Sequence, residues 1–174
     1  MSYNERKIKA LIAEHAVRQY LKTDGWYIER SEVRNSLSGE HNRKLSLDKM
    51  SDIGSLYIRH FPDHVATRTI TIFIQTKNAP TGYPLFNAEK KSIDNLAYLP
   101  EECTLLVFFI YDTAEFCAIL FQKLKQYLPD CVVRTDGGVG GSGTPFYQIP
   151  RNLFEDLSIV LTKLDSDKNK PRAT

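Results

Sequence analysis

The chain has 174 residues, of which 42% are hydrophobic and 25% are charged, and its formal net charge is +2. This length and composition indicate one globular domain with an apolar core, and they exclude a polycationic coat, so any nucleic-acid binding has to come from local basic groups. No apolar run reaches the roughly 20 residues that span a bilayer and the N-terminus has no signal-peptide core, so we expect a cytoplasmic protein without a membrane partner.

In chain order, the hydrophobic pattern switches between helical and extended periods. Residues 4–22 carry apolar side chains at helical spacing and are predicted to form the first helix. The elements expected after it are strands at 26–28, 51–58 and 69–77, a helix at 87–98, strands at 103–111 and 116–121, a short helix ending at 128, a strand at 146–150 and a helix at 151–164. This order predicts an α/β fold in which a mixed central β-sheet is flanked by helices.

The segments between these elements are polar or rich in proline. A polar loop that holds Pro62 is expected between the two central strands, and residues 78–84, with two prolines, are expected to be irregular. Residues 1–164 are predicted to form a single domain. Residues 165–174 contain too few apolar side chains to pack and are expected to form a disordered tail.

Polar residues occupy the ends of the two central strands. Asp52 lies at the start of the first strand, and Gln75-Thr76-Lys77 closes the second. Because side chains two apart in a strand share a face, Gln75 and Lys77 point together. If the two strands pair as a hairpin, the Asp52 carboxylate lies beside the Gln75 amide and the Lys77 ammonium group. Such a cluster suits a divalent metal ion and a phosphodiester.

Glu14 is a second acidic candidate, on the predicted first helix. Most of its helical neighbours are apolar, so it is expected at the border of the core-facing stripe. A carboxylate in that position needs a partner. The alternative is a surface ion pair with Arg18, four residues further on, in the favourable orientation. Asp52 has a comparable alternative, as an exposed acid at a strand end.

An acid on the first helix, an acid at a strand start and a polar-x-Lys strand end together resemble the PD-(D/E)xK nuclease superfamily, the fold of many restriction enzymes and Holliday-junction resolvases. The resemblance covers roughly residues 5–111 and rests on Glu14, Asp52 and Gln75-Thr76-Lys77. Ser51 replaces the proline of the common motif, and Gln75 replaces its second acid, which gives a QxK form similar to that of the Mrr-like and VRR-type branches. The resemblance implies a restriction-endonuclease-like core and a nuclease domain over residues 1–164. It also implies a metal-dependent DNA endonuclease, either restriction-type or structure-specific like a junction resolvase.

The resemblance also implies a role for each candidate residue. The catalytic residues would be Glu14, Asp52, Gln75 and Lys77. Mg²⁺, with Mn²⁺ as a substitute, would be bound by Asp52, by Gln75, by the Thr76 backbone carbonyl and by Glu14. Lys77 would orient the attacking water or neutralise charge on the transition state. Because an amide replaces a carboxylate at Gln75, we expect weak Mg²⁺ affinity and better activity with Mn²⁺.

Basic residues outside this cluster are candidates to contact DNA phosphates, which dominate the affinity of such interfaces. They are Arg34, Arg43, Lys44, Lys49, Lys90 and Lys91. The alternative for the Lys90-Lys91 pair is a solvated helix face. A chain of this length has little room for separate target recognition, so the family resemblance favours a homodimer that cuts both strands.

Two other functional classes stay open. One is a catalytically inactive member of the same fold that binds nucleic acid or a protein partner, and the missing second acid favours it. The other is an unrelated small α/β protein acting in assembly or inhibition. For that class, Asp52→Ala and Lys77→Ala are expected to change nothing functional.

Overall fold

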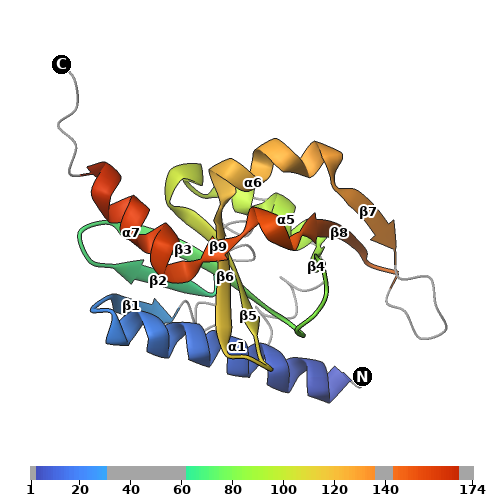
Figure 1. The fold of residues 1–174 in the computed structure, drawn as a ribbon, viewed down its shortest axis with the longest axis horizontal. Helices are drawn as coiled ribbons and strands as arrows, with labels where there is room; N and C mark the ends of the chain where they lie inside the picture. Colours follow the sequence, from blue (N-terminus) through green and yellow to red (C-terminus); the bar gives the residue numbers. More distant parts are fainter. Residues whose placement is uncertain (1–2, 31–61, 136–142, 169–174) are drawn as a thin grey trace, which may run out of the picture.

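The computed structural model describes residues 3–30, 62–135 and 143–168 (Figure 1). The helices in these ranges are α1 (Tyr3–Thr23), α5 (Lys90–Asp94), α6 (Phe121–Tyr127) and α7 (Leu157–Lys168). The strands are β1 (Tyr27–Arg30), β2 (His64–Thr67), β3 (Thr71–Ala79), β4 (Leu85–Glu89), β5 (Thr104–Ile110), β6 (Glu115–Leu120), β7 (Val132–Thr135), β8 (Pro145–Pro150) and β9 (Glu155–Asp156). Short 3-10 turns follow at η1 (Asn95–Tyr98), η2 (Glu101–Cys103), η3 (Leu128–Asp130) and η4 (Arg151–Leu153). None of the helices described here is long and apolar enough to cross a membrane.

Six strands form one mixed sheet in the order β1-β2-β3-β5-β6-β9. β3 and β5 are parallel, and the other neighbouring pairs in this sheet are antiparallel. A second, antiparallel sheet has the order β4-β8-β7. The predicted α/β class, with a mixed central sheet flanked by helices, is confirmed.

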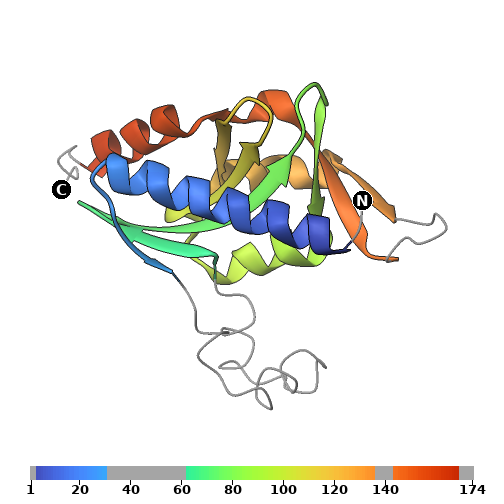
Figure 2. The ribbon, with the colours of Figure 1, turned by 90° about the horizontal axis from the view of Figure 1, so that it is seen from below.

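Each face of the central sheet is covered by helices (Figure 2). On one face, Val17 of α1 and Leu161 of α7 belong to an apolar cluster with Ile72 and Ile74 of β3. On the other face, the cluster contains residues of α5, α6 and the alternate positions of β5. All seven residues of β5 are buried, as the unbroken apolar run predicts for a strand covered on both sides.

The strand that pairs with β3 along its antiparallel edge differs from the prediction. β2 occupies this place, with His64 opposite Ile74 and Thr67 opposite Thr71, so the loop predicted between the central strands is wrong for residues 64–67. The sequence His-Val-Ala-Thr is short and partly polar, and only His64 and Ala66 are fully buried, which leaves little periodic signal. The strand predicted at 51–58 lies outside the described residues.

Several element boundaries also differ from the sequence-based ones. β3 runs from 71 to 79 rather than from 69 to 77, so the irregular segment begins at 80. The helix predicted at 87–98 is wrong at its start, because residues 85–89 alternate between exposed and buried positions and pair with β8.

α7 begins at Leu157, and Asp156 caps it by accepting a hydrogen bond from the Ser158 N–H at 2.8 Å. α7 continues to Lys168, into the predicted tail, and residues 169–174 lie outside the described part.

Arg68, in the turn between β2 and β3, connects that turn to the rest of the domain. Its guanidinium lies over the Trp26 ring, 4.7 Å from the ring centroid, and donates a hydrogen bond to the Asp24 carbonyl oxygen at 2.8 Å. It also forms an ion pair with Asp165 of α7. These contacts join the β2–β3 turn to the α1–β1 connection and to α7.

Replacing Arg68 with Met is expected to lower the free energy of unfolding by about 1–2 kcal/mol, because the cation–π contact and the charge-assisted hydrogen bonds are lost. Urea denaturation measures this change. The matched control is Arg134→Met, at an exposed position of β7, which is expected to change the free energy of unfolding by less than about 0.5 kcal/mol. An equal effect of the two substitutions would show that the Arg68 contacts contribute nothing.

Candidate functional site

Asp63, the residue immediately before β2, forms the centre of the candidate site. Its Oδ2 accepts hydrogen bonds from Gln75 Nε2 at 2.6 Å and from the Thr76 N–H at 2.7 Å. The β2–β3 register, continued by one residue, places Asp63 opposite Gln75. The Asp63 carboxylate therefore holds the start of β2 against Gln75 and Thr76, in the middle of β3.

The backbone of Thr76 is directed toward the same place. In an extended strand the N–H and C=O of one residue point to the same edge. Because the Thr76 N–H reaches Asp63, the Thr76 carbonyl oxygen also faces the β2 edge. The register places Pro62 opposite Thr76, and proline has no N–H to donate. The Thr76 carbonyl therefore faces the same strand edge as the Asp63 carboxylate, and Pro62 offers it no ladder hydrogen bond.

The side chains of Gln75 and Lys77 are half-buried on one face of β3, while Ile72 and Ile74 are buried on the other. This alternation agrees with the side-chain period of a strand. It places the amide and the ammonium group on the face that Asp63 also contacts.

Glu14 and Lys77 both act electrostatically on Asp63. Burial is the largest influence on the Asp63 carboxyl and raises its pKa to about 6. The Lys77 charge and the hydrogen bond from the Thr76 N–H act in the opposite direction and lower this pKa. The Glu14 carboxylate makes a smaller contribution in the same direction as burial, and the value of about 6 includes it. Two carboxyl groups, one amide and one ammonium group therefore belong to a single electrostatic site.

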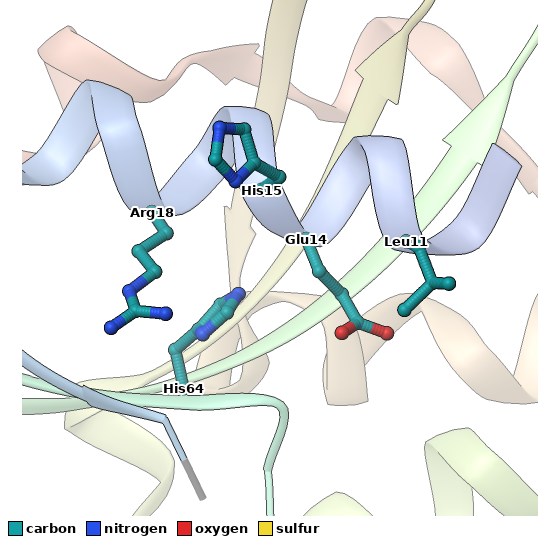
Figure 3. Close-up of a pocket in the computed structure, with 5 residues that line it drawn as sticks. All are labelled: Leu11, Glu14, His15, Arg18 and His64. Carbon is teal, nitrogen blue, oxygen red and sulfur yellow. The ribbon is translucent and has the colours of Figure 1, made fainter. Parts of the chain in front are cut away.

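Glu14 extends from α1 toward the start of β2. It lines a hollow of about 220 Å³, called here the α1 hollow, whose residues are Leu11, Glu14, His15, Arg18 and His64. Figure 3 shows the Glu14 carboxylate and the Arg18 guanidinium on opposite sides of the His64 ring. The two side chains point apart, which disfavours the surface ion pair that was the alternative for Glu14.

Of the residues predicted for the site, Glu14, Gln75, Thr76 and Lys77 gather around Asp63. The other predicted acid and four of the predicted DNA-binding residues lie outside the described ranges; they are Asp52, Arg34, Arg43, Lys44 and Lys49. Their predicted roles stay predictions.

The two remaining DNA-binding candidates are on α5. Lys90 forms an ion pair with Asp94, four residues further along α5, and lies 5.4 Å from the centroid of the Tyr147 ring. Lys91 is exposed. Lys91 is the more accessible cation of the pair, and the predicted DNA-binding roles of both lysines stay predictions.

Asp63 is the functional candidate that the sequence reasoning missed. The signal that identifies it is the dipeptide Pro62-Asp63, in which an acid follows a proline 12 residues ahead of Gln75. The sequence analysis assigns Asp63 to a loop. The four residues of β2 that follow it are too few to show the alternation of a strand.

Carboxylates and imidazoles alone do not form a metal site in the part of the chain that the structure describes. No three His, Cys, Asp or Glu side chains there lie close enough together to hold a metal ion. A cation beside Asp63 would therefore need the amide oxygen of Gln75 and the Thr76 carbonyl in addition to the carboxylates. Oxygen donors of this kind are those that Mg²⁺ and Mn²⁺ accept.

The fold has a counterpart among solved structures. The chain is similar to a nuclease from a fusselovirus, with a TM-score of 0.50 and 8% sequence identity, over 97% of each chain. No protein-family model matches the chain, and no curated protein matches it either. At this identity the likeness shows a shared fold.

The raised pKa of Asp63 predicts a pH-dependent stability. The folded chain binds the Asp63 proton more tightly than the unfolded chain does, since the pKa rises from 3.8 to about 6. The resulting stabilisation is fully present below the lower pKa and is lost as the pH rises through the higher one. Asp63→Asn keeps an oxygen acceptor for Thr76 and Gln75 without the charge, so the variant is expected to exceed the native protein in stability by about 1–2 kcal/mol at pH 7.

Urea denaturation of both proteins between pH 4 and 7.5, with EDTA present, measures this difference. It is expected to grow in favour of Asp63→Asn as the pH rises through about 6 and to vanish near pH 4. A native protein that gains stability relative to the variant over this range would contradict the assignment of burial as the dominant cause.

Proposed function

We propose that this chain is a metal-dependent DNA endonuclease of the PD-(D/E)xK superfamily. Pro62-Asp63 would form the first part of the motif, Gln75-Thr76-Lys77 the second part, and Glu14 the acid on the first helix. The observation that carries the proposal is the environment of the Asp63 carboxylate. It accepts hydrogen bonds from Gln75 and Thr76, and the charges of Lys77 and Glu14 influence its pKa. The fold shared with the fusselovirus nuclease supports it. In this proposal Asp63, rather than Asp52, is the principal acid.

The donor set suits a hard divalent cation. Asp63 and Glu14 supply carboxylate oxygens, Thr76 a carbonyl oxygen and Gln75 an amide oxygen. Gln75 donates its Nε2 to Asp63, so its amide would have to turn before its oxygen could share a cation with that carboxylate. A bound Mg²⁺ or Mn²⁺ would polarise the scissile phosphate and lower the pKa of a bound water.

The remaining residues of the site would act on substrate and water. Lys77 supplies a positive charge on the same face of β3 as Gln75, where it would orient the attacking water or neutralise charge that develops on the phosphate. Glu14 would bind the outer side of the metal shell from α1. Two copies of the chain would cut the two strands of a duplex.

A catalytically inactive DNA-binding member of the same fold is the second candidate. The hydrogen bond between the Gln75 amide and Asp63 favours it, because the amide satisfies the carboxylate without a cation. Cleavage and binding have to be measured separately to distinguish the two candidates.

The proposed nuclease activity is tested with plasmid and branched DNA in the presence of Mg²⁺ or Mn²⁺. Asp63→Asn and Lys77→Ala are each expected to lower the cleavage rate about 100-fold or more, since each removes a group that acts on the reacting phosphate. The matched controls are Asp130→Asn and Lys22→Ala, at exposed positions away from the site, which are expected to cleave like the native protein.

Asp52→Asn separates the two possible principal acids. Cleavage that survives Asp63→Asn and is abolished by Asp52→Asn would contradict the proposed site and return the role to Asp52. Native protein that binds DNA tightly and cleaves none of the substrates with either metal ion would favour the inactive binding protein.

Gln75→Glu tests the effect of the amide on the metal requirement. The additional negative charge is expected to lower the Mg²⁺ concentration for half-maximal cleavage about tenfold. The native protein is expected to need millimolar Mg²⁺ and to work better with Mn²⁺, which binds such sites more tightly. Saturation of the native protein by micromolar Mg²⁺ would count against a weakened site.

A further inference from the structure

The α1 hollow lies beside the acid site but is not part of it. His64, the first residue of β2, directly follows Asp63, and neighbouring residues of a strand point to opposite faces. His64 therefore faces α1, while Asp63 contacts Gln75 on β3. The hollow and the acid site lie at the same strand start, and Glu14, which lines the hollow and acts on Asp63, connects them.

Arg18 is the cation of this hollow. Its Nε is buried and makes no hydrogen bond within the part of the chain that the structure describes. A guanidinium group is always charged and can only donate hydrogen bonds. Figure 3 shows the Arg18 side chain reaching from α1 toward β2 beside His64. A buried donor of this kind needs an acceptor, and an anion that enters the hollow would supply one.

A nucleic-acid strand at the acid site brings such an anion with it. Every nucleotide carries a phosphate, so a strand whose scissile phosphate lies at Asp63 places a neighbouring phosphate close by. A guanidinium binds phosphate oxygens through two parallel hydrogen bonds. Glu14 lies on the other side of His64 from Arg18, so its negative charge directs an anion toward the Arg18 end of the hollow.

We propose that the α1 hollow binds a phosphate group of the nucleic-acid substrate, next to the scissile phosphate, through the Arg18 guanidinium. The proposal rests on the nuclease function proposed above. The bound group is either an internal phosphodiester or a terminal 5′-phosphate. In both cases Arg18 positions the substrate, and the groups around Asp63 act on the bond that breaks.

The test uses DNA duplexes in which one phosphate at a time is replaced by a neutral methylphosphonate. Binding is measured with Ca²⁺ in place of Mg²⁺, for native protein and for Arg18→Met. In the native protein, replacement at one position near the cut is expected to weaken binding about tenfold. In Arg18→Met the same replacement is expected to have little further effect, because the partner of that phosphate is absent. Duplexes with and without a 5′-phosphate distinguish the terminal group from an internal one.

The salt dependence of DNA binding distinguishes a phosphate contact of Arg18 from a purely structural role. If Arg18 only stabilised the fold, its replacement would leave the salt dependence unchanged. Loss of one phosphate contact is expected to reduce the slope of log affinity against log salt concentration by about one. The matched control is Arg6→Met, at an exposed position of the same helix, which is expected to keep the native slope and the native response to each replacement. Arg18→Lys keeps the charge and is expected to recover part of the affinity.

The outcomes separate this inference from the proposed function. If native protein and Arg18→Met both cleave DNA and respond alike to every methylphosphonate, the phosphate site is overturned and the nuclease function stands. If the native protein neither binds nor cleaves any of the duplexes, both proposals are overturned.

Discussion

Asp63 Oδ2 accepts hydrogen bonds from the Thr76 N–H and from the Gln75 amide at the point where β2 begins. Pro62 cannot continue the ladder there, because it has no N–H to donate. The Asp63 carboxylate accepts the Thr76 N–H, so the contact between the two strands continues past the last ladder pair, His64 opposite Ile74. The same carboxylate would bind the cation in the proposed reaction. The Asp63 carboxylate therefore takes part in the pairing of β2 with β3 and is also the principal acid of the proposed site.

The surroundings of Asp63 disfavour its ionised form, since its pKa is raised to about 6. Burial and the Glu14 carboxylate oppose the ionised form of Asp63, and the Lys77 charge and the Thr76 N–H favour it. A second acid at position 75 would add repulsion, whereas the Gln75 amide adds a hydrogen bond. The amide thus stabilises the pairing of β2 with β3, and the same change would weaken the attraction of the proposed site for a cation.

Local periodicity predicts part of the geometry of the candidate site. The alternation along β3 predicts that Gln75 and Lys77 share a face, and the apolar stripe of α1 predicts that Glu14 lies at the border of the core. Asp63 was not predictable in this way, because its role depends on the pairing of β2 with β3. That register is set by tertiary contacts, and the four residues of β2 carry too weak a pattern to reveal it. β4 was missed for a similar reason, since its alternation spans only Leu85–Glu89.

Iron-mediated cleavage of the protein tests the proposed metal position most directly. Fe²⁺ that replaces Mg²⁺ generates oxidants at the metal site in the presence of ascorbate and peroxide, and mass spectrometry locates the backbone breaks. The proposal predicts breaks near Asp63 and within Gln75-Thr76-Lys77, suppressed by excess Mg²⁺ and absent in Asp63→Asn. Breaks that persist unchanged in Asp63→Asn, or that avoid both segments, would contradict a metal site at the start of β2.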